Sequence, residues 1–282
     1  MLKVPHYPSK NFSEHGPDVQ IAGRVRGIGL LALAARRVKS QLGFEYAGSA
    51  LGGIWHLIQP LSMIVIYAVV FGIFLRVQPE YPGVSYGLYL CSVLVPWMAF
   101  SEAILKGSTS ILRSRQYLRK LNVSEMIFSV ESFLHAFISL SVGYLGVIIL
   151  GLIEGVSIQW SWLALPPVFL LMIACGSGIG LFFAVLVPFF TDLTHAVQIG
   201  VRPMFWLTPV IYPITQVGDG FLYQVVSAQP STPFVLAIRQ VYFDGVFPSA
   251  SSWLAMFVWP ICTVTAGMVL LRCLRHEIRD VL

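Results

Sequence analysis

Two ionisable residues, Glu131 and His135, lie in a run of apolar residues that is long enough to cross a membrane. They are four residues apart, so on a helix they share one face and can contact each other or a neighbouring arginine. An ionisable group at the centre of a membrane helix costs about 2.5 to 3.5 kcal/mol, so it needs a partner or a function. Two roles stay open: a structural or gating pair, or a proton relay, although no second carboxylate falls in the middle of another apolar run.

A stripe of aromatic residues follows one face of the predicted helix 86–105 and has a further member in the apolar run before it. Such a stripe usually packs in a helix core or forms a belt that faces lipid. It would also suit a path for sugars, because the C–H faces of sugars stack on aromatic rings without requiring one pattern of hydroxyl groups. The candidate residues of a substrate path are Tyr67, Tyr86, Tyr89, Trp97 and Phe100.

Sequence patterns for nucleotide or metal chemistry are absent. No G-x-x-x-x-G-K-[ST] loop occurs, so the chain is not expected to hydrolyse nucleotide by that route. The glycines Gly176, Gly178 and Gly180 lie in an apolar run, where small residues typically let helices pack closely. Without a CxxC pair, neither a zinc site nor a disulfide framework is expected, and the cysteines are interpreted as free thiols: Cys91, Cys175, Cys262 and Cys273. We expect no catalytic and no metal-binding residues.

The composition is that of a membrane protein. The 282 residues are 56% hydrophobic and 11% charged, whereas soluble proteins have about 25% charged residues. A net charge of +5 would suit nucleic acid in a soluble protein. Here the basic residues lie beside apolar runs, as topology determinants do, so no nucleic-acid partner is expected.

Apolar runs separated by charged or proline-rich segments predict an all-α membrane protein. The first run, 54–75, has 22 residues without Lys, Arg, Asp or Glu, enough helix to cross a hydrocarbon core of about 30 Å. Between 221 and 247 the apolar sequence is broken by prolines and charges, which predicts short re-entrant or periplasmic helices between spans five and six. The six predicted transmembrane helices are 54–75, 86–105, 126–153, 163–187, 199–212 and 253–271.

The distribution of basic residues predicts the topology. Of the 18 lysines and arginines, 15 precede residue 54, fall between 106 and 120, or follow residue 271. Cytoplasmic loops carry such an excess, so both termini are expected in the cytoplasm. The predicted divisions are a cytoplasmic arm (1–23), an amphipathic interface helix with its hinge (24–53), a six-span transmembrane domain (54–271) and a basic tail (272–282).

The interface helix is predicted from apolar residues at helical spacing, including Ala35 and Val38, with Arg36 and Lys39 on the other face. A helix of this kind lies along a membrane surface. It is either a membrane-surface anchor or a docking element for a cytoplasmic partner, and the pattern alone does not separate these two roles.

Several segments resemble the transmembrane permease family of bacterial polysaccharide ABC exporters, which belongs to the type-two ABC permeases. LGGIWHLIQP (51–60) matches the pattern L-G-x-x-W-x-x-x-x-P that precedes the first span in that family. VPWMAF (95–100), FWLTPVIYP (205–213) and QPSTPFVLAIRQVYFDG (229–245) follow in the family's order. The sequence departs from the family at Asn122, Val123 and Thr191. The residues that match family motifs or a gate are Gly52, Trp55, Pro60, Trp206, Pro209, Tyr212 and Arg239.

The resemblance implies a transporter permease in the bacterial inner membrane and not an enzyme. It implies a homodimer that docks two copies of a separate ABC ATPase, which would hold ATP and Mg. It also implies a polysaccharide carried on lipid pyrophosphate, of the O-antigen type, as the substrate. The amphipathic helix and the loop after the second span would receive the motion of the ATPase through Arg36, Arg37, Lys39, Arg113, Arg115, Arg119 and Lys120.

Two alternatives remain beside this interpretation. The first is a type-two ABC permease that exports a capsular glycan, a teichoic acid or a drug. The second is a membrane factor that handles lipid-linked glycans without ATP, for which a cluster of acidic residues on the exit side would be expected. The acidic residues available there are scattered along the sequence.

Overall fold

The computed structural model describes residues 32, 34–38, 62, 65–66, 68–74, 76, 81, 83–120 and 124–281. Within these residues all regular secondary structure is helical, which confirms the predicted all-α class. The elements are η3 (Ala68–Phe74), α4 (Tyr86–Ser108), α5 (Ser110–Arg113), α6 (Arg115–Lys120), α7 (Met126–Ile153), η4 (Trp160–Ala164), α8 (Leu165–Leu186), α9 (Leu193–Leu207), η5 (Ile214–Val217), α10 (Phe221–Ser227), α11 (Thr232–Arg239), η6 (Gln240–Asp244) and α12 (Ala250–Val281).

Four helices of the described part are long and apolar enough to cross a membrane. They are α4, α7, α8 together with η4, and the stretch Ala250–Ile278 of α12. They correspond to the predicted spans 86–105, 126–153, 163–187 and 253–271. The predicted first span lies mainly outside the described residues, so the count of six spans stays a prediction.

The predicted fifth span differs from the helix found there. Helix α9 begins at Leu193 and ends at Leu207, whereas the predicted span was 199–212. Its end has a local cause: Thr208 has extended backbone angles, which the following Pro209 favours because its ring disfavours helical geometry in the residue before it. With 15 residues, α9 is about 22 Å long and too short to cross a hydrocarbon core alone.

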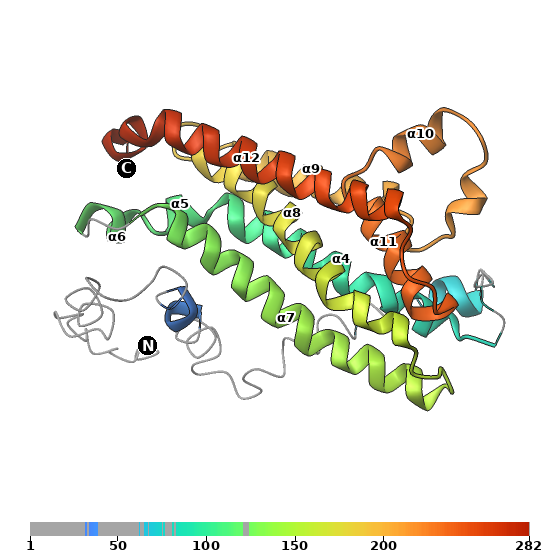
Figure 1. The fold of residues 1–282 in the computed structure, drawn as a ribbon. Coiled ribbons are helices and arrows are strands. Elements are labelled where there is room, and N and C mark those ends of the chain that lie inside the picture. The colour runs from blue at the N-terminus through green and yellow to red at the C-terminus, as the bar shows by residue number, and fades with distance from the viewer. Residues whose placement is uncertain are drawn as a thin grey trace, which may run out of the picture.

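The long helices form a bundle in which α8 lies between α4 and α12, and α7 packs on α4 (Figure 1). The predicted close packing through glycines is confirmed. A Cβ at Gly176 would lie 2.8 Å from the carbonyl oxygen of Phe100, and one at Gly180 would lie 2.8 Å from that of Ala103. A Cβ at Gly178 would meet α12, 2.6 Å from the backbone nitrogen of Val264. The glycines therefore let α8 approach both neighbours at backbone distance.

The two ends of the bundle differ in character. The N-terminal helical segment (34–38), α5, α6 and the last turns of α12 lie at one end, here called the basic end (Figure 1). The short helices α10, α11, η4 and η6 lie at the other, here called the far end. The described parts of the segments predicted to be cytoplasmic thus share one end. The segment 221–247 contains the short helices α10, α11 and η6, and their re-entrant or periplasmic position stays a prediction.

The end of α12 does not follow the predicted boundary at residue 271. The helix continues to Val281, so the predicted basic tail is a helical extension of the last span. Ile278 is fully buried in a cluster with Leu271 of the same helix, Ile111 of α5 and Leu181 of α8. This apolar contact explains why the helix does not end at its basic residues.

We expect Gly180→Ala to lower the free energy of unfolding by about 1 to 3 kcal/mol, because the added methyl group would push α4 and α8 apart. The measurement is thermal unfolding of the detergent-solubilised protein, followed by size-exclusion chromatography. Gly146→Ala on α7 is the matched control, since a Cβ there meets no atom within 4 Å. Equal thermal stability of both variants would contradict the close packing of α4 on α8.

Candidate functional site

The start of α7 holds the N-terminal segment. The Nε of Arg37 donates a hydrogen bond to Oε2 of Glu131 over 2.7 Å, and the two side chains are 15% and 7% exposed. The guanidinium also lies over two aromatic rings, 4.7 Å from the centre of Tyr117 and 5.2 Å from that of Phe128. Planar arginine suits this arrangement, because it can stack on rings and pair with a carboxylate at once.

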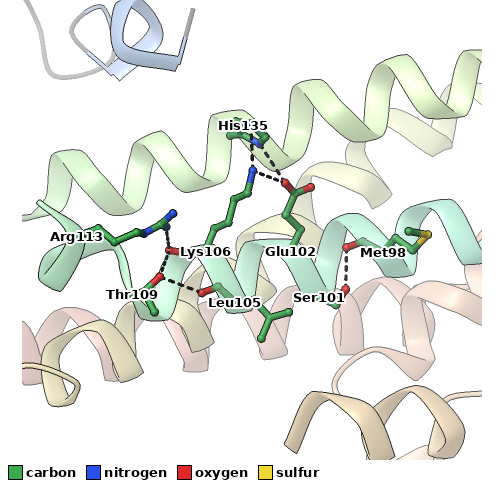
Figure 2. Close-up of polar contacts among 8 residues, drawn as sticks. All are labelled: Met98, Ser101, Glu102, Leu105, Lys106, Thr109, Arg113 and His135. Carbon is green, nitrogen blue, oxygen red and sulfur yellow. Dashed lines mark hydrogen bonds and ion pairs between the residues drawn. The ribbon is translucent and has the colours of Figure 1, made fainter. Parts of the chain in front are cut away.

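One turn further along α7, His135 contacts α4 (Figure 2). Its Nδ1 lies 3.3 Å from Oε1 of Glu102, and its Nε2 lies 3.3 Å from Nζ of Lys106. Lys106 also pairs with Glu102 over 2.8 Å, four residues apart on α4. The residues form a compact ionic cluster between the two helices.

In the structure Glu131 and His135 thus have different partners. Glu131 pairs with an arginine, one of the two partners expected, and His135 contacts a different helix. The sequence reasoning missed Glu102 and Lys106 as partners of His135, although their spacing of four residues is the usual signal of an ion pair on a helix. The cluster links α7 to α4, and a proton relay through it stays a prediction.

A second carboxylate just before α7 holds the end of α12. Glu125 is 1% exposed, and its Oε2 accepts a hydrogen bond of 3.1 Å from Nε of Arg275. Arg275 lies in the segment predicted as a basic tail, and its side chain is half exposed. The two acidic residues at the start of α7 thus pair with arginines from opposite ends of the chain.

The residues predicted to couple to an ATPase occupy different environments. Arg36 and Arg115 are exposed, whereas Arg37 points inward to α7. Arg113 donates a hydrogen bond of 2.5 Å to the carbonyl of Lys106 and so closes the end of α4. Arg119 and Lys120 belong to α6, and Lys39 lies outside the described residues.

The apolar face of the N-terminal segment is also shifted from the prediction. Ala34 and Val38 are buried, and Ala35 is exposed. Ala34 packs with Ile127 and Phe128 of α7. The partner of this face is α7, so the helix packs on protein in addition to any contact with the membrane surface.

The aromatic stripe of α4 packs into the core of the chain. Tyr86, Tyr89, Trp97 and Phe100 are each less than 10% exposed. The ring of Trp97 meets that of Phe205 edge-on, with 4.7 Å between their centres. Their burial matches the core alternative for such a stripe, and their role as a substrate path stays a prediction. Tyr67 lies outside the described residues.

At the far end, Arg239 connects three elements. Its guanidinium donates hydrogen bonds of 2.6 Å and 3.2 Å to the carbonyl oxygens of Val210 and Tyr212, in the segment after α9. It also lies 4.1 Å from the centre of the Tyr89 ring on α4. Arg239 is 3% exposed, so its charge is balanced by these carbonyls and by the π face.

The other family-motif residues of the described part gather around the same turn. The hydroxyl of Tyr212 donates to the carbonyl oxygens of Trp206 and Leu207 and folds the chain back after Pro209. The hydroxyl of Tyr86 donates to the carbonyl of Ile211 over 2.9 Å. The remaining motif residues, Gly52, Trp55 and Pro60, lie outside the described residues.

A stacked pair of aromatic residues holds η6 on η4. Trp162 and Tyr242 stack with 4.9 Å between their ring centres, and the indole Nε1 donates to the carbonyl of Tyr242. Burial raises the pKa of the Tyr242 hydroxyl well above its usual value. The hydroxyl therefore stays protonated and donates to the carbonyl of Val147 on α7.

We expect Arg239→Lys to lower the free energy of unfolding by about 1 to 3 kcal/mol, because an ammonium group cannot serve both carbonyls and the ring of Tyr89 in one geometry. Thermal unfolding in detergent measures the change. Arg202→Lys on α9 is the control, since Arg202 is exposed. A variant of Arg239 as stable as that control would show that its contacts contribute little.

The chain is similar over most of its length to permeases of polysaccharide export. It is similar to the O-antigen export system permease protein RfbA of Klebsiella pneumoniae, with 23% identity over 242 residues that cover 84% of this chain and 90% of that protein. RfbA of Myxococcus xanthus is 22% identical over 257 residues, covering 90% and 95% of the two chains. The polysialic acid transport protein KpsM of Escherichia coli is 22% identical over 252 residues, covering 88% and 94%.

A family model gives the assignment. The model described as ABC-2 type transporter matches residues 31–243, which include the N-terminal segment, the helices α4 to α11 and the contacts of Arg37, Glu131 and Arg239. With its multi-pass helical fold and this match over most of its length, the chain belongs to the ABC-2 type transporter family.

Proposed function

We propose that the chain is the membrane-spanning subunit of an ATP-driven exporter that moves a lipid-linked polysaccharide of the O-antigen type across the bacterial inner membrane. The observation that carries this proposal is the similarity to O-antigen export permeases over 84% to 90% of the chain and at least 90% of each relative. Such coverage means that the similarity extends over nearly the whole fold and not over one segment.

The structure supports a membrane subunit that acts with a partner. Four long apolar helices are available to cross the membrane, and apolar side chains of α7 and α12 such as Leu145, Ile149, Leu254 and Ile261 are exposed, as contact with lipid requires. The basic end carries the exposed cations Arg36 and Arg115 on separate elements. These cations would dock two copies of an ABC ATPase, which holds ATP and Mg, beneath a homodimer of this chain.

The excess of basic residues at one end supports the orientation. Because cytoplasmic segments are enriched in lysine and arginine, the basic end would face the cytoplasm with both termini. The far end, with the turn at Pro209 and Arg239, would then lie at the periplasmic exit. Exposed arginines of the basic end could also attract a lipid pyrophosphate headgroup.

A capsular glycan is the second candidate substrate. The similarity to a polysialic acid transport protein extends over 252 residues, between the 242 and 257 residues matched in the two O-antigen permeases. Export of either polysaccharide would use the same ATP-driven mechanism. The two candidates therefore differ only in the glycan.

The first test is purification of the tagged chain from its native host in mild detergent, with mass spectrometry of the proteins that copurify. We expect a P-loop ATPase in a 1:1 ratio with the permease. Glycosyltransferases without an ATPase, in several detergents, would favour the ATP-independent alternative. Deletion of the gene, followed by separate assays of O-antigen and capsule at the cell surface, distinguishes the two glycans.

We expect the double variant Arg36→Glu and Arg115→Glu to reduce the yield of copurified ATPase by about fivefold or more, because both exposed cations become repulsive toward an acidic docking surface. The control is Arg202→Glu, the reversal of an exposed charge on α9. Normal ATPase yield with the double variant would mean that these two residues do not form the docking surface.

A further inference from the structure

The first turns of α7 and the residue before them make polar contacts with three other elements. Glu125 pairs with α12, Glu131 pairs with the N-terminal segment, and His135 contacts α4. Two of these partners, α12 and α4, are long helices of the bundle. The third, the segment 34–38, carries the exposed Arg36 and begins the part of the chain that the proposed function assigns to ATPase docking.

We propose that Arg37 and Glu131 are positioning residues that clasp the ATPase-facing segment to α7, so that displacement of this segment by the ATPase moves α7 directly. This inference rests on the proposed function. It changes the role of Arg37 from a docking residue on the surface to an internal link, and it gives Glu131 a mechanical role.

The geometry of Arg37 supports a rigid link. Its guanidinium is held by the carboxylate on one side and by the rings of Tyr117 and Phe128 on others, so it contacts α6 and α7 at once. Ala34 and Val38 are buried on the same face of the segment. The segment 34–38, α6 and the start of α7 therefore meet at the partly buried guanidinium of Arg37.

The link continues into the bundle. His135 lies one turn beyond Glu131, and its contacts with Glu102 and Lys106 tie the same part of α7 to α4 (Figure 2). Helix α4 is mostly buried and contacts the far end through Tyr86 and Tyr89. A shift of α7 at Glu131 would thus reach the helix that touches the turn after α9.

The pair of Glu125 and Arg275 provides a matched comparison. It has the same chemistry, an arginine Nε on a buried carboxylate at the start of α7, and a similar length of 3.1 Å. It connects α7 with α12, which packs mainly on α8. Breaking it should weaken the bundle without separating the ATPase-facing segment from α7.

The experiment compares Glu131→Gln, Arg37→Gln, the exchange Arg37→Glu with Glu131→Arg, and Arg275→Gln in the complete complex. The purified complex in lipid nanodiscs gives its yield and its rate of ATP hydrolysis. Cells that carry the same variants give the surface polysaccharide per assembled complex. The ratio of export to hydrolysis reports coupling, and a purely structural defect would leave this ratio unchanged.

We expect Glu131→Gln and Arg37→Gln to assemble with the ATPase and to lower export per ATP by about fivefold or more. The exchanged pair should recover at least about threefold over either single variant, since it restores the ion pair but not the stacking of arginine on the rings. Arg275→Gln should lower the yield of complex and leave export per ATP unchanged.

Three results would overturn the proposed role of the Arg37–Glu131 pair. One is unchanged export per ATP in Glu131→Gln, another is an exchanged pair no better than the single variants, and the third is the same loss of coupling in Arg275→Gln. Failure of the proposed function looks different, because then the wild-type chain itself would copurify with no ATPase or its deletion would leave surface polysaccharide unchanged.

Discussion

The structure depends on two carboxylates that are buried at the start of α7. Removing an ionised carboxylate from water costs several kcal/mol, so Glu125 and Glu131 each require a cation from another element. The cations come from Arg275 and Arg37, which lie 238 residues apart in the sequence. Because an unpaired buried carboxylate is costly, the two ion pairs fix where the N-terminal segment and the end of α12 pack on α7. Apolar contacts alone would define these positions less sharply.

The remaining long helices of the bundle are held together by close backbone packing and not by charge. Gly176 and Gly180 bring α8 to backbone distance from α4, and Gly178 does the same toward α12. In a membrane, where apolar burial adds little between helices, this close contact supplies van der Waals energy. Helix α4, the most buried of the four candidate spans, is fixed near its C-terminal end by glycine contacts at Phe100 and Ala103 and by the polar contacts of Glu102 and Lys106.

The sequence predicts the long helices well because a run of apolar residues has few other stable arrangements in lipid. The span predicted as 126–153 is found as α7 with the same limits. Tertiary partners are less accessible: the burial of Ala34 in place of Ala35, and the inward position of Arg37, depend on α7, which is remote in sequence. The aromatic stripe has the same sequence pattern whether it faces the core, lipid or a sugar. Its burial depends on contacts with Phe205 and with the segment after α9, which the pattern does not contain.

The two ends of α4 use different chemistry, and this difference bears on how the chain could move. At the basic end the contacts are ion pairs with partly exposed members, Glu102 and Lys106, which can separate and form again at modest cost because water can replace each partner. At the far end Arg239 is buried against two carbonyls and Tyr89, where a lost contact would leave a charge without water. A displacement of α7 that reaches α4 through this cluster would therefore carry the far-end turn along as a unit with α4.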